Sequence, residues 1–213
     1  MKIACLTFNP IQENTYVVWD DTKECAVIDA GNSTPKEDAA LDGFLAEHGL
    51  KPVLAVNTHG HFDHVLGVEH LRKTYGIPFA LSGKDKFLLD NAAPGSSIFG
   101  VKVGAMPSID LDLDTTDEVR FGHTALKIIP TPGHTPGSVC LLCETVLFSG
   151  DTLFAGSYGR TDFLGGSSRD MAASLKRLSM LPPETRVLPG HGPSSTIEEE
   201  LRTNPYLRGH GIE

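Results

Sequence analysis

Four apolar segments of strand length run into a turn that contains a glycine and a histidine or an aspartate. They are PVLAVNT (52–58), ALKIIP (125–130), TVLFS (145–149) and TRVLP (185–189). Glycine lets the backbone turn tightly where a strand ends, and histidine and aspartate are common metal ligands. Four buried strand ends that repeat this design predict a sheet-containing fold whose functional side chains gather in the loops after the strands.

The segment THGHFDH (58–64) carries the densest group of such side chains. His59 and His61 are two positions apart, so in an extended chain both rings lie on one side of the backbone. Gly60 between them has no side chain that would block a tight turn. Asp63 and His64 follow at the start of an expected helix, where they can point towards a second, neighbouring position.

The other three turns add His134, Asp151 and His191. Taken singly, each histidine is more often a surface or core side chain than a metal ligand, but four agreeing segments favour a metal site. Two ions with three protein ligands each and one shared carboxylate use the whole set, which is His59, His61, Asp63, His64, His134, Asp151 and His191. The remaining histidines lack this context and are expected to have no ligand role: they are His48, His70, His123 and His210.

The apolar runs alternate with amphipathic stretches of helical spacing at residues 35–49, 64–76 and 169–180. This alternation predicts an α/β architecture in which helices cover sheets. The chain has 213 residues and no segment of linker-like composition, so we expect one domain over residues 1–213.

Two further local structures are expected. The segment EVRFGHTALKII suggests a hairpin whose turn is Gly122-His123. The alternation of Asp110, Asp112 and Asp114 with leucines indicates a half-buried strand with one solvated face.

The overall charge limits the partners of the protein. The formal net charge is -9, the isoelectric point is near 5.4, and the 18 Lys and Arg residues are scattered. Nucleic-acid binding draws on clustered basic residues, so we expect no nucleic-acid partner. No apolar run approaches the roughly 20 residues of a membrane span, and the N-terminus lacks a signal-like segment. We therefore expect a cytoplasmic protein with no membrane partner.

The four cysteines are expected to be reduced, which also favours a cytoplasmic location. Cys140 and Cys143 match a CxxC pattern, but they lie in an apolar run expected to be a strand, where positions three apart face opposite sides of the sheet. Core packing of reduced thiols is therefore favoured over a redox or zinc pair.

These motifs, in this order, resemble the metallo-β-lactamase superfamily, and more closely its short bacterial hydrolases of the glyoxalase II (hydroxyacylglutathione hydrolase) type. The resemblance runs through QENTYVV, THGHFDH, TPGHTPGS, GDTLFAGSYGRTDF and VLPGHG to the closing ELRTNPYL. It implies a four-layer αβ/βα sandwich with a dinuclear site on one edge. The first metal position would use His59, His61 and His134, the second Asp63, His64 and His191, and Asp151 would bridge them.

The resemblance also implies a reaction. Two divalent ions, with zinc as the default and iron or manganese as alternatives, would present a hydroxide that attacks a thioester carbonyl, with Asp63 as ligand and as the group that orients the nucleophile. Tyr158 and Arg160 would border the substrate; Arg160 either grips a substrate carboxylate or pairs with Asp162. Glyoxalase II enzymes with a helical C-terminal domain after the last ligand use it to bind glutathione, and only residues 192–213 follow here, so another small thioester is an open possibility.

Other members of the superfamily supply the alternatives. Persulfide dioxygenases share a GRTDF stretch and use one iron, which would take His59, His134 and Asp151; the GSYGRTDFLGG context and the NPYL ending favour the hydrolase. A β-lactamase role is less expected because no cysteine stands among the seven ligands. A non-catalytic metal-binding protein is disfavoured by seven converging ligands, and a nuclease or phosphodiesterase by the acidic charge.

Overall fold

The computed structural model describes residues 1–97, 100–101, 103–104 and 106–207 of the chain; His210 lies outside them. Two six-stranded sheets form its centre. The first contains, in spatial order, β1 (Lys2–Phe8), β2 (Glu13–Trp19), β3 (Glu24–Ile28), β4 (Lys51–Val56), β5 (Phe79–Leu81) and β6 (Leu111–Asp112). The second contains β14 (Ser195–Thr196), β13 (Arg186–Pro189), β10 (Val146–Gly150), β9 (Val139–Cys143), β8 (Thr124–Pro130) and β7 (Glu118–Phe121). A small hairpin joins β11 (Leu153–Phe154) to β12 (Ser157–Tyr158).

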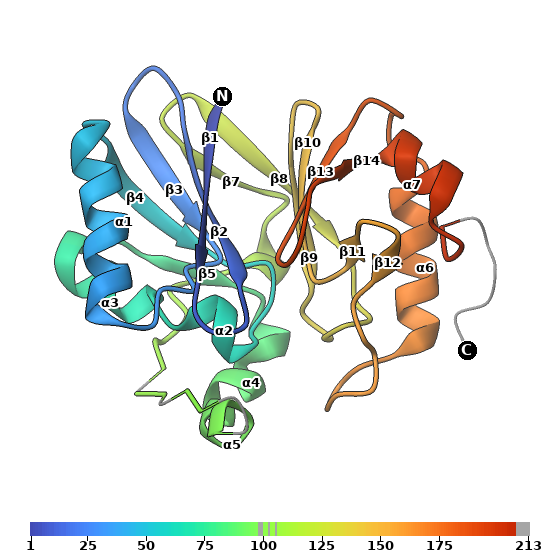
Figure 1. Ribbon diagram of the computed structural model, residues 1–213, viewed down its shortest axis with the longest axis horizontal. Coiled ribbons are helices and arrows are strands. Elements are labelled where there is room, and N and C mark those ends of the chain that lie inside the picture. Colours follow the sequence, from blue (N-terminus) through green and yellow to red (C-terminus); the bar gives the residue numbers. More distant parts are fainter. Residues whose placement is uncertain (98–99, 102, 105, 208–213) are drawn as a thin grey trace.

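Helices cover the outer face of each sheet (Figure 1). The helices are α1 (Pro35–Glu47), α2 (Phe62–Val65), α3 (Val68–Tyr75), α4 (Lys86–Asp90), α5 (Ala92–Ser97), α6 (Ser168–Leu178) and α7 (Ile197–Thr203). Two short 3-10 turns lie at Gly83–Asp85 and Leu113–Thr115. In Figure 1, α1 and α3 lie outside the first sheet, and α6 and α7 lie outside the second.

Three hydrophobic clusters hold these layers together. The inner faces of both sheets meet in the central cluster, where Ile28 and Val56 of the first sheet share a core with Leu141 and Phe148 of the second. A second cluster packs the first sheet against α1 and α3, and a third packs the second sheet against α6 and α7. Buried apolar area of this kind is the main favourable term in folding. The expected four-layer αβ/βα sandwich is confirmed.

The cysteine prediction is confirmed in its geometry. Cys140 packs in the outer cluster under α6, whereas Cys143 faces the central core between the sheets. Both thiols are free. The two side chains therefore lie on opposite faces of β9 and do not form a CxxC pair.

The helix expected over residues 64–76 is in fact two helices, because the chain turns at Gly67. The Gly67 backbone N–H donates to the Ala30 carbonyl at 2.8 Å. A Cβ at this position would lie only 1.8 Å from Asn32 Oδ1. The close approach to the loop after β3 ends α2 early and sets the direction of α3.

The expected strand at residues 110–114 is wrong beyond Leu111–Asp112. Asp112 Oδ1 accepts hydrogen bonds from the backbone N–H groups of Gly83, at 2.9 Å, and of Asp114, at 3.0 Å. Short polar side chains of this type compete with a strand by binding nearby backbone groups. The acidic alternation thus fixes two neighbouring turns instead of extending a sheet.

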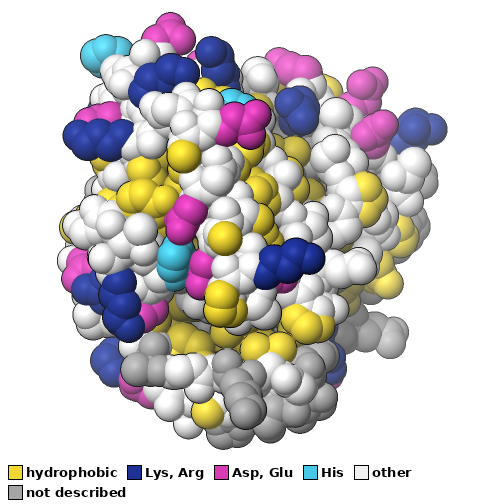
Figure 2. Space-filling view, turned by 60° about the vertical axis from the view of Figure 1, so that its left-hand side comes forward, with side chains coloured by type: hydrophobic (Ala, Val, Ile, Leu, Met, Phe, Trp, Pro, Cys, Tyr) yellow, Lys and Arg dark blue, Asp and Glu magenta, His cyan; other side chains and the backbone are white. Residues whose placement is uncertain are grey.

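The surface shows no concentration of basic residues on the face seen in Figure 2, where Lys and Arg side chains are interspersed with Asp and Glu. Among the described residues, no helix combines the length and the apolar character needed to cross a bilayer.

Candidate metal centre

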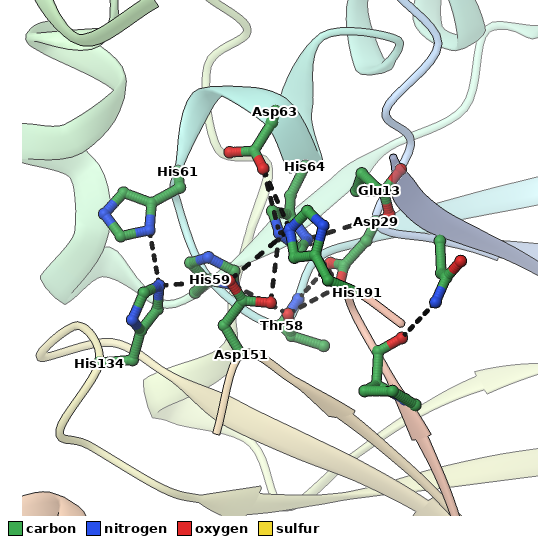
Figure 3. A network of polar contacts seen from close by, with 12 residues as sticks. Glu13, Asp29, Thr58, His59, His61, Asp63, His64, His134, Asp151 and His191 are labelled. Atoms are coloured by element: carbon green, nitrogen blue, oxygen red, sulfur yellow. Dashed lines mark hydrogen bonds and ion pairs between the residues drawn. The ribbon is translucent and has the colours of Figure 1, made fainter. Parts of the chain in front are cut away.

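All seven predicted ligand side chains meet at one edge of the two sheets (Figure 3). The first sheet supplies four of them, because His59 and His61 lie in the loop after β4 and Asp63 and His64 lie on α2. The second sheet supplies the other three from the loops after β8, β10 and β13, which carry His134, Asp151 and His191. The site is therefore assembled from both halves of the sandwich.

The first group of donors consists of His59, His61 and His134, whose ligand atoms all lie within 4.8 Å of one another. His61 Nδ1 is 2.8 Å from His134 Nε2. His134 Nδ1 lies 2.7 Å from the Arg160 carbonyl oxygen, which can only accept, so the ring presents Nε2 to the group. His59 Nε2 is buried and has no hydrogen-bond partner. Three imidazole nitrogens thus face one point.

The second group consists of Asp63, His64 and His191. His191 Nε2 is 3.2 Å from Asp63 Oδ2 and 3.2 Å from His64 Nε2. His64 is fully buried, and its Nδ1 lies 3.2 Å from Asp29 Oδ2 on the side away from the group. A carboxylate behind an imidazole fixes the ring orientation and raises its basicity as a ligand.

Asp151 stands between the two groups. Its Oδ1 is 3.5 Å from His64 Nε2, and its Oδ2 is 3.5 Å from His134 Nε2. Oδ1 is buried and has no hydrogen-bond partner. A buried, unpaired carboxylate oxygen is costly unless a charged partner satisfies it. The position of Asp151 therefore suits a carboxylate shared by two cations.

The charges of the site are unevenly distributed. Burial, with the positive charge of His64 nearby, holds the pKa of His59 well below its usual value, and burial lowers the pKa of His61 to about 4. Burial also opposes a charge on His64, but Asp63 and Asp151 outweigh it and raise the pKa of His64 well above its usual value. His59 and His61 are therefore neutral imidazoles in the first group, and in the second group a cation would replace the proton on His64.

The positive charge of His64 also affects the pKa of Asp151. Burial opposes ionisation, but the charge of His64 outweighs it and holds the pKa of Asp151 well below its usual range. Neutral imidazoles, ionised carboxylates and unpaired buried donor atoms together fit divalent metal ions such as zinc, iron or manganese.

Two buried carboxylates that the sequence did not single out position these loops. Asp29, at the end of β3, accepts at 2.7 Å from the backbone N–H of Thr58 and at 2.7 Å from its hydroxyl. The Thr58 hydroxyl in turn lies 3.1 Å from His59 Nδ1. Asp29 therefore orients His59 as well as His64.

Asp85 is the second of these carboxylates and is fully buried. Its Oδ2 accepts from the backbone N–H of Gly60 at 2.9 Å and from the hydroxyl of Thr135 at 2.6 Å, and its Oδ1 accepts from the N–H of Gly137 at 2.7 Å. Burial raises the pKa of this carboxyl, against hydrogen bonds that favour its charged form. Asp85 thus joins the loop of His59 and His61 to the loop of His134.

A cleft of about 720 Å³ opens above the donor groups. Both predicted substrate residues, Tyr158 and Arg160, line it. The Arg160 guanidinium forms a two-point ion pair with Asp162, at 2.7 and 2.6 Å. Arg160 was expected either to grip a substrate carboxylate or to pair with Asp162, and the ion pair with Asp162 is present. The backbone carbonyl of Arg160 also orients His134.

Comparisons with known proteins cover nearly the whole chain. Residues 8–191 match the model of the metallo-beta-lactamase superfamily. The chain is 35% identical over 217 residues to the probable metallo-hydrolase YqgX of Bacillus subtilis, and this match covers 100% of both chains. It is 31% identical over 217 residues to the hydroxyacylglutathione hydrolase GloC of Haemophilus influenzae, covering 97% of this chain and 98% of the relative. It is 34% identical over 202 residues to the human mitochondrial persulfide dioxygenase ETHE1, covering 91% of this chain and 70% of that one.

Solved structures show the same likeness. The crystal structure of BLEG-1 B3 metallo-beta-lactamase superposes with a TM-score of 0.89 at 37% identity, covering 97% of this chain and 99% of the other. The crystal structure of TTHA1623 in a di-iron-bound form superposes with a TM-score of 0.85 at 37% identity, covering 95% of this chain and 99% of the other.

Proposed function

Because the chain belongs to the metallo-beta-lactamase superfamily, we propose that it is a metal-dependent hydrolase whose substrate is a small thioester. The observation that carries this proposal is the position of Asp151 between the two three-residue donor groups. Its Oδ1 lies 3.5 Å from His64 Nε2, and its Oδ2 lies 3.5 Å from His134 Nε2 and 3.7 Å from His191 Nε2. Two metal positions that share a carboxylate suit a reaction in which a water is activated and a carbonyl is polarised at the same place.

The proposed ligands are the seven residues named above, with His59, His61 and His134 at the first position, Asp63, His64 and His191 at the second, and Asp151 between them. Bound divalent ions supply a water that is deprotonated near neutral pH and a Lewis acid for the substrate carbonyl. Zinc is the first metal to test, and iron and manganese are the alternatives, since the similar protein TTHA1623 has been crystallised with two irons.

The protein's own residues have separate tasks in this proposal. Asp63 lines the cleft and contacts His191 through Oδ2 at 3.2 Å, so its carboxylate is placed to orient the nucleophile. Tyr158 and Arg160 line the cleft and position the substrate. The departing thiolate has a conjugate acid with a pKa of about 8.5 in the cysteine reference, so the reaction needs no strong general acid.

Likeness to GloC favours a thioester. That relative is named a hydroxyacylglutathione hydrolase, and the match covers 98% of its length. A relative of about the same length thus has a name that refers to a hydroxyacylglutathione. For this reason S-lactoylglutathione must be included in any substrate panel. A β-lactam belongs in the panel as well, because of the likeness to BLEG-1.

The test is the Asp63→Asn variant. We expect thioester hydrolysis to fall by about 10²-fold or more, the cost of misplacing a reacting group, while far-ultraviolet circular dichroism stays unchanged. Near-wild-type hydrolysis by this variant would refute the assignment of Asp63. Metal content measured by inductively coupled plasma mass spectrometry on both proteins separates a lost metal from a lost catalytic group.

The second candidate function is persulfide oxidation, favoured by the 34% identity to human ETHE1. A single iron held by His59, His134 and Asp151 would leave open positions for oxygen and substrate. Since a similar protein binds two irons, the identity of the metal does not separate the two functions. The number of metal ions per chain, measured together with activity, does separate them. One iron per chain and oxygen uptake with glutathione persulfide would favour the dioxygenase. Two ions per chain and thioester cleavage would favour the hydrolase.

A further inference from the structure

The walls of the cleft differ in character from its floor. The floor carries the ligand candidates, whereas most wall side chains are apolar and come from three separate parts of the chain: Ile11, Leu88, Ala92, Phe154, Phe163 and Leu164. The polar side chains of Asn91, Ser157 and Tyr158 also line the cleft. Ile11 comes from the turn after β1, Leu88 and Ala92 come from α4 and α5, and the others follow Asp151 along the chain. Elements distant in sequence thus contribute side chains of one kind to the same surface.

Two of these side chains are unusually exposed. Phe163 is 41% and Leu164 is 72% accessible to solvent, and both stand at the rim of the cleft. Adjacent large apolar side chains left in water beside a pocket mark a surface that a ligand covers.

The cleft offers little to a charged group. Outside the seven ligand candidates, Arg160 is the one charged side chain among the described residues that line it. Its guanidinium is neutralised by Asp162, and its Cζ atom lies 3.9 Å from the centre of the Phe163 ring. The net charge of -9 adds no long-range attraction for an anion. A substrate carboxylate would therefore find no unpaired cation on these walls.

From these observations, and resting on the proposed thioester hydrolysis, we infer that the cleft is an acyl subsite for apolar chains. The substrate is then a thioester whose acyl group is a hydrocarbon chain or ring, and not a carboxyacyl group. The reaction adds water across the C–S bond: the hydroxyl goes to the acyl carbon, the thiol leaves with a proton, and the product is a free carboxylic acid.

The experiment uses the metal-loaded protein and straight-chain acyl thioesters of N-acetylcysteamine, an uncharged thiol, from acetyl to octanoyl. We expect kcat/KM to rise about four-fold for each added methylene until the cleft is filled, the factor that follows from burying one CH₂ group. The kcat/KM of the hexanoyl thioester should exceed that of the adipoyl monothioester, in which a carboxylate replaces the terminal methyl group, by more than about ten-fold. A flat or falling series, or a preference for the adipoyl compound, would overturn the inference and leave the thioesterase proposal intact.

A matched pair of variants ties the effect to the cleft. Leu164→Asn changes an exposed rim residue, and Leu201→Asn changes a side chain on α7 that is 37% exposed and lies outside the cleft. We expect the first variant to flatten the dependence of kcat/KM on chain length and the second to leave it unchanged. An equal effect of both variants would contradict the assignment of the subsite.

A binding measurement keeps the inference testable if no thioester is cleaved. Titration calorimetry of the series from acetate to octanoate against the metal-loaded protein should show the dissociation constant falling about four-fold per methylene. Absence of hydrolysis with this trend present would refute the proposed function alone. Equal affinity for acetate and octanoate would refute the subsite, whatever the protein catalyses.

Discussion

Replacement of Asp85 by asparagine tests whether this buried carboxylate holds the two ligand loops together. Asp85 accepts three hydrogen bonds, from Gly60, Thr135 and Gly137. Asparagine keeps one acceptor oxygen, so its amide group must face at least one of these donors. A hydrogen bond to a charged group contributes about 1.5–3 kcal/mol, and an unpaired buried donor costs about 1–3 kcal/mol. We expect Asp85→Asn to lower the free energy of unfolding by about 2–4 kcal/mol.

The loss should also appear in metal binding. The three donors to Asp85 lie beside His59, His61 and His134, and loss of an outer-shell partner typically reduces metal affinity about 10–100-fold. Competition with a chromophoric chelator measures this affinity. Scanning calorimetry of the metal-free protein measures stability, where a chain of this size loses roughly 2–4 °C in Tm per kcal/mol.

Glu200→Gln is the matched control. The Glu200 carboxylate is also buried, at 1% exposure, and accepts from the backbone N–H of Gly156 at 2.9 Å and from Asn204 Nδ2 at 2.8 Å, away from the ligand loops. This variant should lose stability and keep its metal affinity. If Asp85→Asn also keeps wild-type metal affinity, Asp85 is only a stabilising residue and the positioning role is refuted.

Three further predictions concern other parts of the site and its support. Gly150→Ala should destabilise the protein more than Gly49→Ala. Gly150 has φ +49° and an added Cβ would lie 2.2 Å from Thr58 Oγ1, whereas Gly49 has φ +61° but faces open space, so only the backbone cost of about 1–2 kcal/mol applies there. Equal losses of stability in chemical denaturation would contradict this. Hydrogen bonds from Ser33 and Asn9 outweigh burial and lower the pKa of Glu37 below 4.5, so the stability that Glu37 adds is present above that pH and is lost as the pH falls through its folded pKa. The Tm difference between wild type and Glu37→Gln should therefore shrink between pH 5 and pH 3. A constant Tm difference would argue against this role of Glu37. Zinc at 100 times its dissociation constant should add about 2.7 kcal/mol to the stability of the chelator-treated protein, and an unchanged Tm would count against a folded-state metal site.

The seven candidate ligands could be picked out from the sequence because each of them belongs to a local pattern. His59 and His61 are two residues apart in an extended segment, and His134, Asp151 and His191 each follow a short apolar strand and a glycine. Strand ends in a sandwich of this kind meet at one edge. The structure accordingly brings all seven side chains together. The contacts of His64 with Asp29 and Glu13 are additions that the pattern did not suggest.

The supporting residues were not accessible in this way. Asp85 is 25 residues from Gly60 and 52 from Gly137 in the chain, and it lies in a segment, LSGKDKFLL, that resembles an ordinary helix start. Its partners are backbone N–H groups, which every sequence contains. The one available signal was the pair of glycines, because a Cβ at Gly60 or Gly137 would lie within 3.0 Å of Asp85 atoms. A glycine beside a ligand therefore indicates a close neighbour but does not identify it.

The break at Gly67 and the turns at Asp112 escaped prediction for a related reason. Periodicity describes which face of an element is apolar, but it carries no information on which distant backbone group approaches that element. Gly67 is fixed by the Ala30 carbonyl, and Asp112 by the N–H of Gly83. The two contacts join segments 37 and 29 residues apart, respectively.

In the proposed metal centre, the division of the candidate ligands between two sheets couples the stability of the core to the geometry of the donor groups. His61 and His134 lie 2.8 Å apart although they come from different sheets, so a shift of one sheet against the other by a few tenths of an ångström changes that separation directly. The central core is close-packed and resists such a shift, and Asp85 adds a polar link between the same two loops beside the ligands. A substitution in the central core, such as Phe148→Leu, should therefore weaken metal binding without touching a ligand. A substitution of similar size in the cluster under α6, such as Leu178→Val, should lower stability alone, because that cluster packs one sheet against its own helices.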